Sequence, residues 1–181
     1  YDKDVEKELA KGDLYYACER VNDIVNVHYG GNTKDVLDCY NRIIQFCEKF
    51  ESLDYDKRAA AFPETHNVDY VAERLADAYE GKADIFADFG NMDKAIECID
   101  HAIKLEREHP FETGLNCLSS KIYWLPDEAI KLLDEEIKAV KSMDPKRWSY
   151  YDNLAAQEEA KKEEIQVWET WKNELLEKPA K

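Results

Sequence analysis

The stretch from Tyr79 to Pro110 repeats its apolar residues with the period of an α-helix. In its second half, apolar side chains follow one stripe of about 3.6 residues per turn, and polar side chains fill the opposite side. The stripe consists of Ala95, Ile96, Ile99, Ala102, Ile103 and the stem of Glu106. The polar side consists of Asp93, Lys94, Glu97, Asp100 and Lys104. This half is therefore predicted to form an amphipathic helix.

The first half of the stretch predicts another helix, which pairs with the second. Its apolar positions are Leu75, Tyr79, Ala83 (or Ala78), Phe86 and Phe89. Gly90 supplies the positive φ that ends a helix, and Asn91 or Asp93 caps the next one. Because the connecting loop is so short, the two helices must pack antiparallel.

Two other segments repeat the pattern of the second helix. Ala129 opens one of them and lies 34 residues after Ala95. Val36 aligns with Ala95 at an offset of 59 residues, which is one such period plus an insertion. A fixed period of this length is typical of helical-repeat proteins, which need about three units for stability. The sequence therefore predicts an all-α chain of stacked helix pairs.

The spacing within the central unit resembles the tetratricopeptide repeat (TPR). The opening W-x2-L-G-x2-Y of that family corresponds here to Tyr79-x2-Lys82-Ala83-x2-Phe86, and its A-x3-F segment corresponds to Ala95-x3-Ile99. Lys82 stands where the family has leucine, and no proline follows until Pro110, so the repeat is degenerate. The resemblance implies a right-handed α-solenoid of antiparallel helix pairs, whose first helices line a concave groove.

We expect one domain, 1–181, of about seven helices. Gly12-Asp13 is the predicted break near the N-terminus, with Asp13 as a cap. The remaining divisions are units at about 13–50, 69–108 and 112–143, an insertion at 51–68, and a long charged C-terminal helix at 149–177 that caps the stack.

Composition and charge narrow the class of protein. The net charge of −15 argues against nucleic acid and anionic membrane as partners, because both require clustered Lys and Arg. The chain has no apolar run long enough to span a membrane and no signal-peptide pattern. Its five cysteines are odd in number and include no C-x2-C pair, which favours free thiols in a reducing compartment. We therefore expect a cytoplasmic protein.

No constellation of residues indicates catalysis. The four histidines, His28, His66, His101 and His109, have no spacing that gathers metal ligands on one helix face. Nucleophile-elbow, P-loop and glycine-rich nucleotide motifs are absent from the sequence. The expectation is a non-catalytic protein-interaction module without a metal or cofactor.

Carboxylates form the candidate partner site. If the groove exists, the inner face of its central helix carries Asp77, Glu80, Asp84 and Asp88. Like charges on one helix stripe repel one another, so an unpaired stripe favours a cationic partner. The expected apolar walls are Val21, Val25 and Tyr29 on one side, and Phe111, Leu118 and Ile122 on the other. We predict a site for a basic, partly apolar peptide or helix. The alternative is that these acids simply form the solvated face of an acidic protein.

Two other functions fit the same sequence. One is a sensor or regulatory domain of a larger protein, whose concave face binds a signalling peptide. The other is a structural subunit that forms homo-oligomers through Trp168 and Trp171 of the C-terminal helix.

Overall fold

The computed structural model describes residues 2–27, 33–51, 53–61, 69–111 and 117–177, and this part of the chain is all-helical, with no strand. Its α-helices are α1 (Asp2–Ala10), α2 (Leu14–Val27), α3 (Thr33–Glu51), α4 (Tyr55–Ala61), α5 (Tyr70–Asp88), α6 (Met92–Glu108), α7 (Cys117–Trp124), α8 (Ala129–Ser142) and α9 (Leu154–Glu177). Two short 3₁₀ turns, η1 (Pro126–Glu128) and η2 (Pro145–Arg147), precede α8 and α9. The all-α prediction is confirmed.

Caps and glycines fix the helix ends where the sequence predicted them. Gly12 and Gly90 have φ of +79° and +74°, which only glycine adopts without strain. The Asp13 carboxylate accepts the Tyr16 N–H at 3.2 Å. The Asn91 side chain accepts the Lys94 N–H at 3.4 Å, so Asn91, and not Asp93, caps α6.

Other boundaries differ from the prediction. The C-terminal helix begins at Leu154 and not at 149, because Asn153 caps it by accepting the Ala156 N–H at 2.9 Å. The expected insertion contains α4, while 62–68 lie outside the described residues, as do 112–116 of the expected unit at 112–143. The described residues hold nine α-helices instead of about seven, since the insertion and the N-terminal segment each add one.

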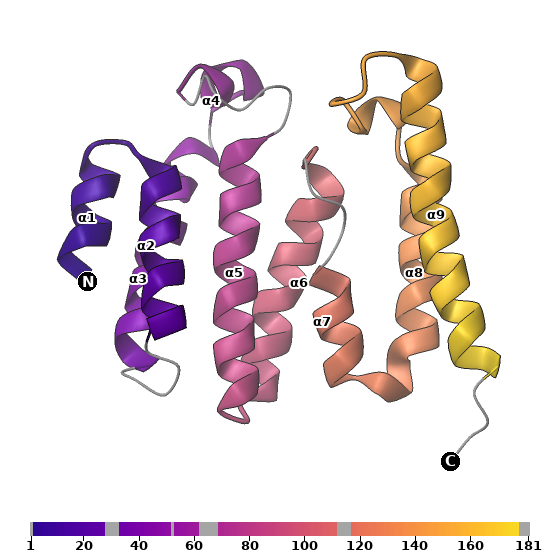
Figure 1. Ribbon diagram of the computed structural model, residues 1–181, viewed down its shortest axis with the longest axis horizontal. Coiled ribbons are helices and arrows are strands. Elements are labelled where there is room, and N and C mark those ends of the chain that lie inside the picture. The colour runs from indigo at the N-terminus through magenta and orange to yellow at the C-terminus, as the bar shows by residue number, and fades with distance from the viewer. Residues whose placement is uncertain (1, 28–32, 52, 62–68, 112–116, 178–181) are drawn as a thin grey trace.

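The helices stand side by side in a row that follows chain order (Figure 1). Each contacts mainly its neighbours: α1, α2 and α3 pack together, α3 packs on α5, α5 on α6, α6 on α7, α7 on α8, and α8 on α9. Helix α4 lies at the end of the α3–α5 pair. Because α5 contacts both α3 and α6, it joins the N-terminal helices to the C-terminal ones.

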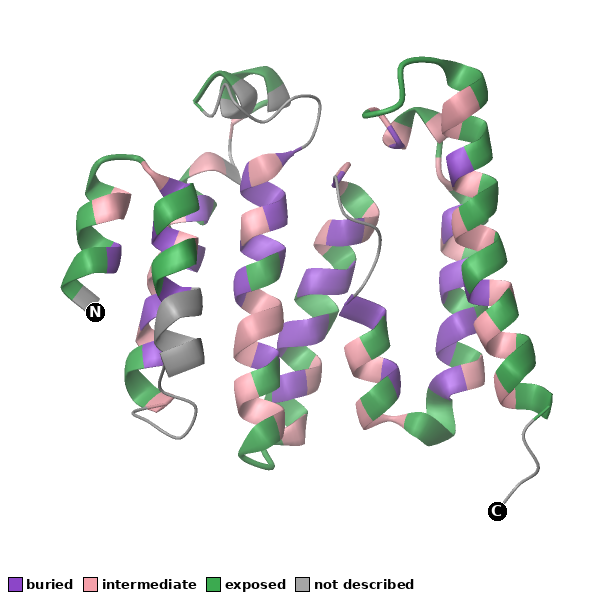
Figure 2. Cartoon of the chain, viewed as in Figure 1, coloured by how far each residue is buried: buried purple, intermediate pink, exposed green. Residues whose placement is uncertain are grey.

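Two clusters of buried apolar side chains hold this row together. The N-terminal cluster unites α1, α2, α3 and one side of α5, and the C-terminal cluster unites the other side of α5 with α6 to α9. Tyr79 and Leu105 pack against both. Figure 2 shows buried positions along most of α5, α6 and α8, whereas much of α9 faces solvent. The predicted stripe of α6 is buried apart from the half-buried Ile96.

Charged groups are also buried, and of these the sequence indicated only the stem of Glu106. Glu136 is 1% exposed and forms an ion pair with Arg107, whose Nε lies 2.9 Å from its carboxylate. Arg147 donates to the carbonyl of Arg107 at 2.7 Å and so ties η2 to α6. Glu106 is buried as well, and its carboxylate accepts the Cys117 N–H at 3.3 Å. These contacts link α6 to α7, α8 and η2, because a buried carboxylate needs donors nearby.

Candidate functional site

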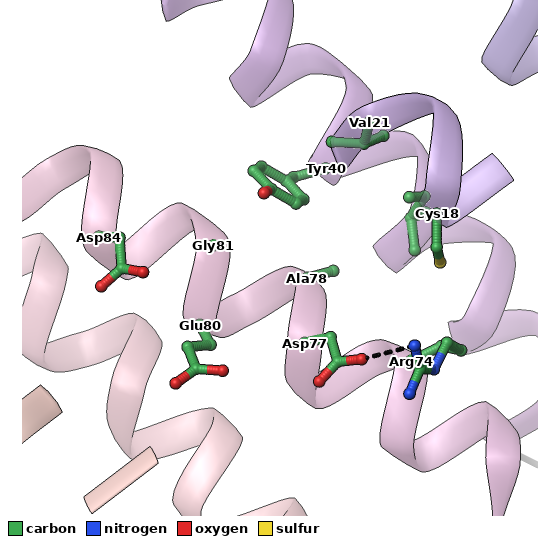
Figure 3. A pocket seen from close by; sticks show the side chains of 10 residues that line it. Cys18, Val21, Tyr40, Arg74, Asp77, Ala78, Glu80, Gly81 and Asp84 are labelled. Atoms are coloured by element: carbon green, nitrogen blue, oxygen red, sulfur yellow. Dashed lines mark ion pairs between the residues drawn. The ribbon is translucent and has the colours of Figure 1, made fainter. Parts of the chain in front are cut away.

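A pocket of about 250 Å³ opens where α2 and α3 meet α5 (Figure 3). Its walls combine apolar side chains of α2 and α3 with the polar face of α5. The lining residues are Cys18, Val21, Tyr40, Ile43, Arg74, Asp77, Ala78, Glu80, Gly81 and Asp84. Three of the four acidic residues predicted for partner binding therefore gather at one pocket, and the fourth, Asp88, continues the stripe as an exposed residue one turn further along α5.

Gly81 gives the pocket its shape. A methyl group at this position would lie 2.8 Å from Cε1 of Tyr40 and closer still to Cζ and the hydroxyl oxygen. Such an approach is too short for a real side-chain contact, so only glycine lets the Tyr40 ring lie against the α5 backbone. Glycine in a helix interior is unfavourable by about 1 kcal/mol relative to alanine, and this close packing accounts for its presence.

The carboxylates along α5 titrate above their usual range. Burial, and then repulsion by Asp84 and Asp77, raise the pKa of Glu80, although a hydrogen bond from the Cys117 thiol opposes this. Burial and then Asp88 raise the pKa of Asp84. Burial raises the pKa of Asp77 too, against the pull of Arg74. Each shift means that the folded protein holds this negative charge at an energetic cost.

Arg74 is the cation of this pocket in the described part of the chain. Its guanidinium lies 2.9 Å from Asp77 and 3.2 Å from the buried Glu73, and it stacks over the Tyr70 ring at 5.3 Å. Asp77 is 49% exposed, so water screens this pair. Among the described residues, Asp84 has no ion-pair partner of its own. One arginine shared by two carboxylates leaves the pocket negative.

The thiols near the acidic face are poor nucleophiles. Burial raises the pKa of Cys18 to about 12. Burial raises the pKa of Cys117 further, and Glu106 and Glu80 add to the shift because the thiol lies between their carboxylates. A nucleophilic cysteine needs a lowered pKa. All five cysteines are free, and all but Cys18 are buried. At neutral pH the thiols of Cys18 and Cys117 therefore stay protonated.

The predicted apolar wall on the C-terminal side is not available to a partner. Leu118 and Ile122 are 2% and 5% exposed, and Phe111 is buried with them in the C-terminal cluster. Helix α7, which carries Leu118 and Ile122, is short and turns its apolar face into the core, so this part of the groove prediction is wrong. On the other side Val21 lines the pocket, while the side chain of Val25 and the whole of Tyr29 lie outside the described residues.

The tryptophans proposed for self-association belong to the core. Trp168 is 5% exposed and Trp171 is half-buried, and their rings stack with centroids 5.9 Å apart. Both pack in the C-terminal cluster between α8 and α9. The exposed apolar residues of α9 are instead Leu154, Val167 and Leu176.

A second pocket, of about 440 Å³, lies between α3, α5 and α6. At its edge the His109 ring nitrogen Nδ1 lies 3.0 Å from the buried carboxylate of Asp69. Asp69 also caps α5 and donates its N–H to the carbonyl of Pro110 at 2.9 Å. The pair therefore joins the start of α5 to the end of α6. Both acidic and basic side chains line this pocket, so it lacks the negative electrostatic potential of the first pocket.

Sequence reasoning missed Tyr40, Arg74 and Cys18 as members of the site. Tyr40 and Gly81 lie 41 positions apart, and helical periodicity carries no information on such a contact. One signal was present: Gly81 interrupts an otherwise good helix-forming segment, and such a glycine usually marks a close approach.

No protein-family model, curated protein or solved structure matches the chain. Among the described residues, no group of three or more His, Cys, Asp or Glu side chains is placed to hold a metal ion. A search of the same residues finds no helix with the length and apolar character needed to cross a bilayer.

Proposed function

We propose that this chain is a non-catalytic interaction module, a TPR-like right-handed α-solenoid, that binds a basic and partly apolar peptide or helix. The row of helices, each packed on its chain neighbours, supports a solenoid. Helix α5 stands in the middle of this row and offers its acidic face to the partner. The same site would serve in a regulatory domain of a larger protein.

The observation that carries this proposal is the gathering of Asp77, Glu80 and Asp84 at one pocket with a single, shared arginine. Burial raises the pKa of all three. A folded chain gains nothing from this arrangement by itself. A cationic partner would neutralise the carboxylates and so remove the repulsion between them that destabilises the free protein.

The environment of the acids supports a partner that is also partly apolar. Val21, Ile43 and Ala78 line the same pocket. Screened surface charges contribute only about 0.2–1 kcal/mol per pair, so charge alone gives weak and salt-sensitive binding. Apolar contacts would supply the remaining affinity and would persist at high salt.

The experiment is a selection of random peptides on the immobilised chain, followed by affinity measurements at low and high salt. We expect enrichment of peptides with Lys or Arg beside apolar residues, and affinity that falls as salt rises. Asp84→Lys with Asp88→Lys should lower the affinity at low salt by at least about tenfold, since two attractions become repulsions.

The matched control is Glu97→Lys with Glu135→Lys, which changes the net charge equally at exposed positions of α6 and α8. This control should leave most of the affinity intact, while circular dichroism shows equal helicity in both double variants. Selected peptides without a basic bias, or equal losses in both variants, would overturn the proposal.

A further inference from the structure

An unpartnered hydroxyl lies against the acidic face of α5. Tyr40 is 9% exposed and lines the pocket beside Gly81. Within the described part of the chain its hydroxyl has no hydrogen-bond partner. The side chain is otherwise nearly buried, and solvent reaches the hydroxyl oxygen, so its donor and two acceptor positions are open to a ligand at the pocket. This observation is independent of the acidic residues.

The hydroxyl stands between two carboxylates along the helix. Asp77 lies four residues before Gly81 and Asp84 three residues after it, and residues at these spacings share one face of a helix. Because Tyr40 meets α5 at Gly81, the side chains of Asp77 and Asp84 flank the contact on either side. Figure 3 shows Tyr40 reaching from α3 toward this segment of α5.

The electrostatics of the pocket select a cation with hydrogen-bond donors. Asp77 is already paired with Arg74, and Glu80 accepts a hydrogen bond from the Cys117 thiol, so Asp84 is the pocket carboxylate that remains for a ligand. Burial, and then Asp84, raise the pKa of Tyr40 to about 12, so the phenol stays neutral at physiological pH and its oxygen can accept a hydrogen bond. A ligand that donates to both the Tyr40 oxygen and Asp84 satisfies each of them.

The size and walls of the pocket suit one aliphatic side chain. A volume of about 250 Å³ is below the ~300–1,000 Å³ of sites that take a whole small molecule. Val21, Ile43 and Ala78 offer apolar contact for a methylene stem. Lysine combines such a stem with a compact ammonium group, which donates in three directions. Arginine binds best when both oxygens of one carboxylate meet its planar fork, whereas the compact ammonium can divide its donors between Asp84 and the Tyr40 oxygen.

We propose that this pocket holds the ammonium group of one lysine side chain of the partner, hydrogen-bonded to the Tyr40 hydroxyl and to Asp84. The proposal rests on the proposed function and adds the residue that anchors the partner. The methylene stem of this lysine lies along the Tyr40 ring and Val21.

The test is an NMR titration of the whole ¹⁵N-labelled chain with small cations at constant ionic strength. The probes are a lysine capped at both ends, n-butylguanidinium, spermidine, and tetramethylammonium, which has the charge but no N–H donor. Capped lysine should shift the Ala78 and Gly81 amides with saturation, and tetramethylammonium should not. Tyr40→Phe should weaken lysine binding about tenfold, as expected for a lost hydrogen bond to a charged group. Tyr123→Phe, at an exposed position of α7, is the matched control and should change nothing.

Several results would overturn the proposal. The first is an equal amide shift with capped lysine and with tetramethylammonium, the second is tighter binding of n-butylguanidinium than of capped lysine, and the third is lysine binding that Tyr40→Phe does not change. The fourth is saturation by spermidine but not by capped lysine, which would indicate a site for free polyamines. The two proposals fail separately. If selected basic peptides bind the acidic face but capped lysine does not enter the pocket, only the lysine site is lost. If capped lysine binds but basic peptides do not, the interaction module is lost.

Discussion

Substituting Gly81 by alanine tests how tightly α3 packs on α5. Two effects oppose each other. Alanine in a helix interior is more favourable than glycine by about 1 kcal/mol. The new methyl group, however, would overlap the Tyr40 ring, and such overpacking costs about 1–3 kcal/mol. The ring is nearly buried and cannot swing freely into solvent. We therefore expect Gly81→Ala to lower the free energy of unfolding by about 1 kcal/mol.

A second substitution reverses the sign. Tyr40→Leu keeps the inner carbons of the side chain but removes Cζ, Cε1 and the hydroxyl, which are the atoms that the methyl group would meet. In this background Gly81→Ala should stabilise the protein by about 1 kcal/mol, through helix propensity alone. The difference between the two backgrounds gives a coupling energy of about 2 kcal/mol.

Urea denaturation of the four variants, followed by circular dichroism at 222 nm, measures this coupling. Equal effects of Gly81→Ala in both backgrounds would refute the reasoning, because additivity means that position 81 and the Tyr40 ring are not in contact. A stabilising Gly81→Ala in the otherwise unchanged protein would refute it in the same way. Either result would also mean that the Tyr40 hydroxyl does not lie at the pocket.

Three further predictions concern charges. Arg107→Ala should lower the free energy of unfolding by about 3–5 kcal/mol in urea denaturation, because it leaves the Glu136 carboxylate buried without its ion pair. Replacing both Arg107 and Glu136 by methionine should restore most of this stability. Asp84→Asn should raise the free energy of unfolding at pH 7 by a few tenths of a kcal/mol. Burial and Asp88 raise the folded-state pKa of Asp84, so its ionisation destabilises the fold as pH rises from about 4 through that pKa. Denaturation at a series of pH values should show that Asp84→Asn no longer stabilises the protein below about pH 4, where Asp84 is protonated in both the folded and the unfolded chain. Asp69→Ala should lower the thermal midpoint through the loss of about 1–2 kcal/mol of N-cap stabilisation, whereas Asp69→Asn should keep most of it.

Local features of the fold could be predicted from the sequence because their causes are local. Positive φ at Gly12 and Gly90, the cap at Asn91 and the buried stripe of α6 depend on residues within one or two turns. The same signals failed at the start of α9. There the polar residues before Leu154 fit a helix or a turn equally well, and the cap at Asn153 decided between them.

Contacts between distant segments could not be predicted in this way. Periodicity indicates that α7 has an apolar face, but it does not show whether Leu118 turns to the core or to a partner, and the structure places it in the core. Glu136 occupies a core position because Arg107, 29 residues earlier, neutralises it. The acidic stripe could be predicted, whereas the opposing Tyr40 hydroxyl depends on how α3 docks on α5.

A double-mutant cycle across the partner contact tests the proposed site most directly. A selected basic peptide, and its analogue with norleucine in place of the anchoring lysine, are each titrated into the unchanged protein and into Tyr40→Phe by calorimetry. If the lysine ammonium donates to Tyr40, replacing the lysine should weaken binding about tenfold more in the unchanged protein than in Tyr40→Phe. If the loss is the same in both proteins for every lysine of the peptide, no lysine contacts this hydroxyl, and the pocket beside α5 is not the site that anchors the partner.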